Sequence, residues 1–154
     1  MAQTLRDLDP GTYYHVIAQG NEDRAVFESQ RDREVFLGYC SSATERYGAI
    51  IHCYCLMDDH YHLLLETPEG NLSQIMRHIN GAYTTYCNTQ CQRFGPVFRE
   101  RFRAIPVEAD LCAGELSRYL HLNPVRAGLV ERPENYIWSS YRSYVGLGSA
   151  AEWL

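Results

Sequence analysis

Apolar and polar positions along the chain follow two periods, one typical of strands and one typical of helices. Strand-like runs, either rich in β-branched and aromatic residues or alternating with a period of two, cover residues 13–19, 49–57, 60–67 and 97–107. Helical spacing covers residues 29–47, 71–92 and 110–122, and Asn123-Pro124 is expected to end the last helix. The predicted order is therefore β-α-β-β-α-β-α.

This order is typical of an α+β fold of the ferredoxin-like (RRM-like) kind, in which helices pack on one face of an antiparallel sheet. A chain of 154 residues has the size of a single domain, here residues 1–154. With 45% apolar and 21% charged residues and no low-complexity tract, it is neither a disordered nor a fibrous sequence.

No apolar run is long enough to predict a membrane span, and residues 1–10 precede no apolar segment of the kind found in secretion signals. The six cysteines form no Cys-x-x-Cys pair. A domain of this length has a sufficient core without disulfides, so we expect a cytoplasmic protein with reduced thiols and no membrane partner.

The net charge of −5 argues against binding to nucleic acid through bulk electrostatics, but the charge is unevenly distributed. Between residues 77 and 142, nine arginines stand against six acids. All 14 basic residues are arginines, whose planar guanidinium suits bidentate contacts with phosphate. A genome rich in Arg codons explains the same composition equally well.

The first candidate site is the His60-Tyr61-His62 run inside a predicted strand. Residues two apart in a strand project from the same face, about 7 Å apart along the backbone, so both imidazoles can converge on one cation. Asp59 and its neighbour Asp58 can accept hydrogen bonds that fix the imidazole tautomers. The alternative is a polar turn followed by two half-buried strand histidines that bind nothing.

The second candidate is Tyr119 together with Asn123, near the end of a predicted helix. Residues four apart share a helix face, so a phenol and an amide reach the same neighbour. A tyrosine can displace an alkoxide from a phosphodiester and form a covalent phosphotyrosine. His121 and Arg118 are candidates for activating that phenol. Tyrosine is abundant, however, and Tyr86 with Gln90 has the same spacing.

A third candidate is the alternating set Arg99, Arg101 and Arg103, which a continuous strand would place on one face. Like charges on one face repel each other, so phosphates are expected to lie there. Phe94, Phe98 and Phe102 lie nearby and either stack on bases or belong to the core.

Several motifs in order along the chain resemble those of the REP-associated tyrosine transposases, which are single-tyrosine HUH transposases. These motifs are YHVI (14–17), YCLM (54–57), HYHLLL (60–65), GPVF (95–98) with RF (101–102), RYLHLNPVRAGL (118–129) and WSSY (138–141). The resemblance extends over residues 13–146, and the ordered set is more specific than any one motif.

The resemblance implies a ferredoxin-like fold in which His60 and His62 bind a divalent metal, Mg²⁺ or Mn²⁺, with Asn123 completing the site. It implies that Tyr119, and not Tyr86, is the nucleophile. The implied substrate is single-stranded DNA with hairpins formed by palindromic repeats, which is cleaved and rejoined through a 5′-phosphotyrosine. Further contacts with this DNA are expected from the arginines of the second half, namely Arg99, Arg101, Arg103, Arg118 and Arg126.

Two positions depart from the family pattern: Gln19 stands where the family usually has Arg, and Asp59 where Asn is common. Two other functions are open from the sequence, a non-catalytic nucleic-acid-binding domain of the same fold and a structural zinc site formed by Cys53, Cys55, His60 and His62. The aromatic segment 138–144 is suited either to docking on the domain or to forming a homodimer.

Overall fold

The computed structural model of the chain describes residues 10–92, 94–99, 102–148, 151 and 153–154. Its strands and main helices follow the predicted order: β1 (Thr12–Gln19), α1 (Gln30–Tyr47), β2 (Ile50–Leu56), β3 (His60–Thr67), α2 (Leu72–Cys91), β4 (Arg103–Val107) and α3 (Ala109–Arg126). Short helical turns lie at Asn21–Asp23, Pro133–Asn135 and Tyr141–Tyr144, the last of which is α4.

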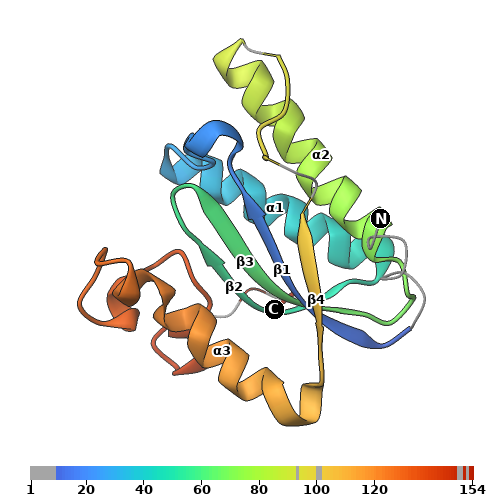
Figure 1. The fold of residues 1–154 in the computed structure, drawn as a ribbon, viewed down its shortest axis with the longest axis vertical. Coiled ribbons are helices and arrows are strands. Elements are labelled where there is room, and N and C mark those ends of the chain that lie inside the picture. The colour runs from blue at the N-terminus through green and yellow to red at the C-terminus, as the bar shows by residue number, and fades with distance from the viewer. Residues whose placement is uncertain (1–9, 93, 100–101, 149–150, 152) are drawn as a thin grey trace.

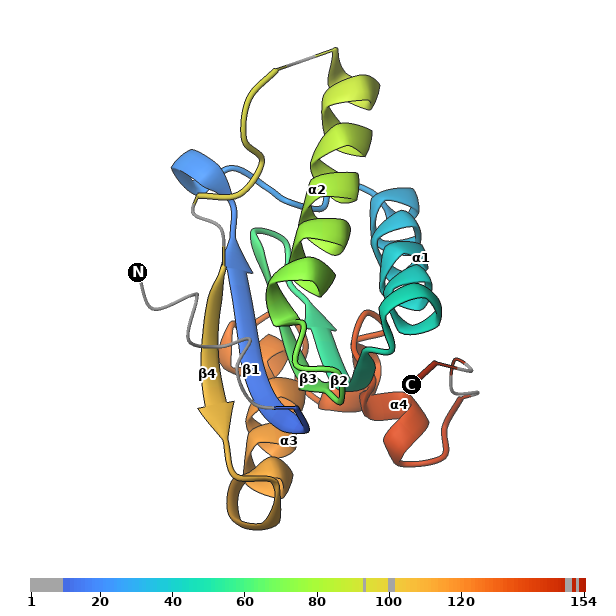
Figure 2. The same ribbon diagram turned by 90° about the vertical axis from the view of Figure 1, so that its right-hand side faces the viewer.

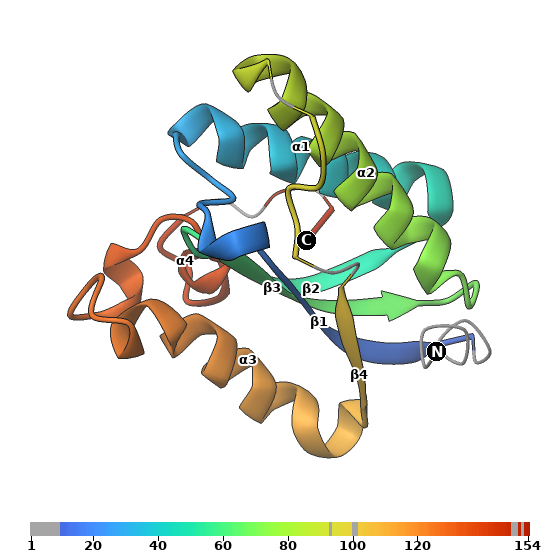
Figure 3. The ribbon, with the colours of Figure 1, turned by 45° about the horizontal axis from the view of Figure 1, so that its top comes forward.

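The four strands form one sheet in the order β2-β3-β1-β4, and every pairing is antiparallel. Helices α1 and α2 lie side by side on one face of this sheet, whereas α3 crosses the other face (Figure 1, Figure 3). Figure 2 shows the strands side by side, with α2 in front of the sheet and α3 behind it. The ferredoxin-like class is confirmed, but only α1 and α2 share a face as expected.

The face beneath α1 and α2 carries the main apolar core. Alternate residues of the central strands point into it, among them Val16, Leu63 and Leu65, and all three are fully buried. From α2, Ile75, Ile79 and Tyr83 complete this core at helical spacing. Periodicity therefore places the stabilising side chains of both strands and helices correctly.

The face beneath α3 has only a small apolar cluster around Cys53, Leu64 and Leu120. Next to this cluster, β1 and β3 place His15 and His62 on the same face, and both are buried. The side of the sheet with the smaller core is thus the side with ionisable groups.

Two elements differ from their predicted bounds. Strand β4 begins at Arg103, and among the described residues of the expected earlier part Phe98 forms an isolated bridge to Gly20. Helix α3 continues through Pro124 to Arg126. A proline lacks an N–H and usually breaks a helix interior, but in the last turn it removes only one hydrogen bond before the helix ends.

The aromatic segment after α3 docks on the domain itself. The Leu56 N–H donates to the carbonyl of Trp138, and the Ser140 N–H donates to that of Tyr54, which extends the sheet beyond β2. Five cysteines lie in the part of the chain that the structure describes in detail, and all five are free thiols. Among the described residues, no helix combines the length and apolarity needed to cross a membrane.

Candidate active site

The loop between β2 and β3 orients the first histidine of the predicted pair. Asp59 Oδ1 lies 2.7 Å from Nδ1 of His60, so Nε2 of that ring remains available for another partner. The loop is anchored by the Gly20 N–H, which donates to the Asp59 carbonyl at 2.8 Å. A Cβ at Gly20 would lie 2.2 Å from the Arg24 carbonyl oxygen, so only glycine fits this close approach.

The second histidine, His62, lies beside the first and is held at both of its ring nitrogens. The ring centroids of His60 and His62 are 5.0 Å apart, and both rings project toward α3, as the spacing predicts. His62 Nδ1 lies 2.9 Å from Nε2 of His15, and its Nε2 lies 2.6 Å from the amide nitrogen of Asn123. The second histidine is therefore a fixed element of the site.

Burial keeps His62 uncharged, because its side chain is in a poorly solvated position under α3. With 5% of the residue exposed, burial and then the nearby His60, His15 and Arg126 lower the pKa of His62 to about 3. Burial and the charge of Arg103 also lower the pKa of His15. Neutral imidazole is the form that binds metal ions.

Tyr119 lies next to these rings on the underside of α3. Its ring meets those of His15 and His62 edge-on, with centroids 6.5 and 6.4 Å apart, and the residue is 50% exposed. The guanidinium carbon of Arg126 lies 4.0 Å from the centroid of the Tyr119 ring, and the same guanidinium donates to the Tyr119 carbonyl. A phenol, an amide and two imidazoles from distant parts of the chain therefore meet at one place.

The predicted supporting role of His121 is wrong. Residues two apart on a helix point in nearly opposite directions, so His121 faces away from Tyr119 and is buried beneath the C-terminal segment. Its Nε2 lies 2.7 Å from Oγ of Ser140, and burial lowers its pKa to about 4. The competing tyrosine, Tyr86, donates instead to Asp32 Oδ1 on the opposite side of the sheet.

The zinc alternative is also wrong. Among the residues that the structure describes, no group of three or more His, Cys, Asp or Glu side chains is arranged to hold a metal ion. Cys55 donates to the sulfur of Met57, and Cys53 to the hydroxyl of Tyr144. Burial raises the pKa of Cys53 and brings that of Cys55 to about 12.

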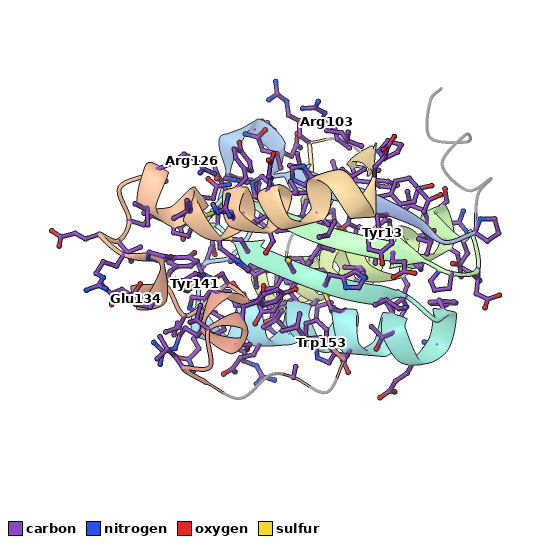
Figure 4. All side chains as sticks on the ribbon, turned by 90° about the horizontal axis from the view of Figure 1, so that it is seen from below. Tyr13, Arg103, Arg126, Glu134, Tyr141 and Trp153 are labelled. Carbon is purple, nitrogen blue, oxygen red and sulfur yellow. The ribbon has the colours of Figure 1, made fainter. Side chains whose placement is uncertain are left out.

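The arginines lie on the α3 side and at the β4 edge. Arg99 and Arg103 line a hollow of about 240 Å³ together with Ile17, Ala18, Gln19 and Phe102. Arg99 precedes β4, and its N–H donates to the Gln19 carbonyl; Arg101 lies outside the described residues. Figure 4 shows Arg103 and Arg126 along the same edge of the molecule, and Arg118 is exposed on α3.

His15 also belongs to this site, although the sequence did not predict it as a candidate residue. It precedes His62 by 47 residues, and only the pairing of β1 with β3 brings the two rings together. A signal was present in the sequence: His15 alternates with the apolar Tyr14 and Val16, which places it on the other face of β1. The strand register needed to connect it to the histidine pair is not visible in the sequence.

This arrangement agrees with the family to which the chain belongs. The family described as "Transposase IS200 like" matches residues 10–123, about three quarters of the chain, and the protein is a member of it. The matched stretch includes both histidines of β3, Tyr119 and Asn123.

Relatives and solved structures agree with this membership. A Haemophilus influenzae protein provisionally named a REP-associated tyrosine transposase is 24% identical over 98 residues, which cover 56% of each chain. The present chain thus matches little more than half the length of that relative. A REP-associated tyrosine transposase solved with a bound REP hairpin aligns with a TM-score of 0.76 and 17% identity, over 96% of this chain and 86% of that one.

A second solved structure supports the same fold. It is described as a transposase of Deinococcus radiodurans, again by a provisional name, and aligns with a TM-score of 0.53 and 15% identity. The alignment covers 72% of this chain and 89% of that one. At this level of identity, both structural matches establish the fold alone.

Proposed function

We propose that this protein is a transposase that cleaves and rejoins single-stranded DNA, with Tyr119 as the nucleophile. One observation carries the proposal: the rings of Tyr119 and His62 are 6.4 Å apart, and Asn123, one helical turn further on, contacts the same imidazole. A nucleophile adjacent to side chains that can bind a cation is the minimum requirement for metal-assisted attack on a phosphodiester.

The side chains around His62 fit a divalent cation, Mg²⁺ or Mn²⁺. His60 and His62 both have Nδ1 engaged by a neighbour, which leaves Nε2 of each ring to bind a metal. The amide of Asn123 is already within hydrogen-bonding distance of one of these nitrogens, and rotation of the amide would present its oxygen. Bound there, the cation would supply Lewis-acid polarisation of the scissile phosphate.

The protein's own residues then carry out a balanced transesterification. The phenol oxygen of Tyr119 forms a bond to phosphorus, the bond between phosphorus and the 3′ oxygen breaks, and the phenol proton passes to solvent at the exposed side of the ring. The products are a 5′-phosphotyrosine and, after protonation, a free 3′-hydroxyl. Attack by another 3′-hydroxyl reverses the reaction and joins two strands without net hydrolysis.

The DNA would lie along the edge that carries Arg103 and Arg126. The hollow with Arg99 and Arg103 can neutralise phosphates on one side of Tyr119, and Arg126 on the other; we also assign Arg101 and Arg118 to DNA contacts. Since a solved relative of the same fold was bound to a REP hairpin, we propose hairpin DNA of palindromic repeats as the substrate. The site would operate in the cytoplasm.

The proposal is tested by assaying for a covalent protein–DNA adduct. The protein is mixed with a labelled single-stranded hairpin oligonucleotide and Mn²⁺, and the products are separated on a denaturing gel. We expect a slower-migrating protein–DNA species that is absent with Tyr119→Phe and still present with Tyr86→Phe. Binding without any adduct would instead support the non-catalytic alternative. Light scattering of the same samples measures whether the protein forms a homodimer.

A further inference from the structure

The third histidine, His15, contacts the histidine pair without belonging to it. Its Nε2 lies 2.9 Å from Nδ1 of His62, and the two rings stack with centroids 5.2 Å apart and planes 22° from parallel. His15 is 8% exposed and His62 5%, so neither ring can readily exchange this contact for water. A buried hydrogen bond between two imidazoles fixes the proton position on both.

The hydrogen bonds around His62 assign that proton. The amide nitrogen of Asn123 can only donate, so Nε2 of His62 accepts and carries no proton. The proton of the neutral ring therefore lies on Nδ1 and is donated to Nε2 of His15. In this tautomer the lone pair on Nε2 of His62 points toward Asn123, which is the direction a bound cation would occupy.

We propose that His15 is a positioning residue that holds His62 in the tautomer and rotamer required to bind the divalent cation. The proposal rests on the metal site of the proposed function. It assigns different partners to the two histidines of β3: a carboxylate, Asp59, orients His60, whereas a neutral imidazole orients His62. Residues that orient a metal-binding histidine in this way typically change metal affinity by about 10- to 100-fold when removed.

Two substitutions separate the hydrogen bond from simple packing. His15→Phe keeps a ring against His62 but removes the acceptor, and leaves a buried N–H without a partner. His15→Gln keeps an acceptor close to the position of Nε2. His78→Phe is the control, because that histidine lies on α2, on the other face of the sheet, with its Nε2 3.0 Å from Oγ of Ser42.

The first measurement is the affinity for Mn²⁺ without DNA, by titration calorimetry. We expect the dissociation constant to rise about 10- to 100-fold in His15→Phe and to stay within about threefold of the wild type in His15→Gln and His78→Phe. Equal affinity in the wild type and His15→Phe would overturn the inference and leave the proposed function intact. Absence of Mn²⁺ binding by the wild type would overturn the metal site and this inference together.

The second measurement needs no metal. Nitrogen-15 NMR of the imidazoles distinguishes a proton on Nδ1 from one on Nε2, and we expect His62 of the metal-free wild type to carry it on Nδ1. In His15→Phe the ring should lose this preference, while His15→Gln should restore it. A His62 tautomer that is the same in all three proteins would show that His15 contributes packing alone and would reject the proposal.

Discussion

The two faces of the sheet differ in the side chains that they carry, although the same strands form both. Toward α1 and α2, strand side chains such as Val16, Leu63 and Leu65 are fully buried and apolar. Toward α3, the same strands present His15, His60 and His62, and the apolar cluster is small. Consecutive residues of a strand point to opposite faces of the sheet. The side chains that stabilise the fold and those proposed to carry the chemistry are therefore separated by strand alternation.

The largest effect on activity should come from removing His60, which lies at the edge of the sheet face toward α3. His60→Ala deletes a proposed metal ligand from a partly exposed position, so the rate of adduct formation with Mn²⁺ should fall by more than about a thousandfold. The free energy of unfolding should change by less than about 1 kcal/mol. Both values come from single-turnover gels and urea titrations. A large loss of stability would show that the faces are not separate.

The second substitution is made in the apolar core between the sheet and helices α1 and α2. Ile79→Ala leaves a cavity in a fully buried position, so the free energy of unfolding should fall by about 3 kcal/mol. The affinity of the folded protein for Mn²⁺ should be unchanged, as measured by calorimetry at low temperature. Ile137→Ala, at a position that is 60% exposed, is the control and should alter neither quantity. A change in affinity of tenfold or more in Ile79→Ala would contradict the separation.

Acid should weaken the α3 side selectively. The pKa values of His62 and His121 are about 3 and about 4 in the folded protein, whereas unfolded histidines take up protons near pH 6.5. Stability is therefore complete above pH 6.5 and is lost as the pH falls toward the folded pKa values, by about 1.4 kcal/mol per pH unit for each histidine, or about 2 kcal/mol each by pH 5.

Urea titrations at pH 7, 6 and 5 in the presence of a chelator measure this loss. His121→Gln removes one titrating group, so its unfolding free energy should fall less steeply with acid than that of the wild type. An identical pH dependence in the two proteins would mean that His121 has the same pKa in the folded and unfolded states.

The smallest effect should follow Arg126→Ala. The guanidinium covers the ring of Tyr119 at the protein surface, where such a contact contributes about 0.5–1 kcal/mol. We expect adduct formation to slow by about two- to fivefold, and the free energy of unfolding to fall by no more than about 1 kcal/mol. Arg118→Ala, on the neighbouring exposed part of α3, is the control for lost charge. Equal slowing by both substitutions would indicate that Arg126 acts only through DNA phosphates.

Much of the fold follows from local periodicity. The predicted bounds of α1, α2 and β3 agree with the structure to within about one residue, because these segments combine strong amphipathic spacing with clear end signals, such as Ser29 before α1 and Gly48 after it. The end of α3 was predicted too early, since the rule that proline breaks helices does not apply to a last turn.

The candidate site was predictable in part, for a physical reason. His60 with His62, and Tyr119 with Asn123, are pairs at strand and helix spacing, so local geometry alone places each pair on one face. Contacts between distant segments, such as that of His15 with His62, depend on strand register and were not predictable. The role predicted for His121 is wrong because His121 is near Tyr119 along the chain but lies nearly opposite to it around the helix.

The hydrogen bond between His121 and Ser140 has a consequence for the C-terminal tail. Ser140 is also bound to β2, so it ties the rear of α3, the helix that carries Tyr119, to the sheet. It lies beyond residue 123, where the match to the family stops. A substitution in this tail would therefore alter the anchoring of the helix that carries the nucleophile without replacing any side chain of the site.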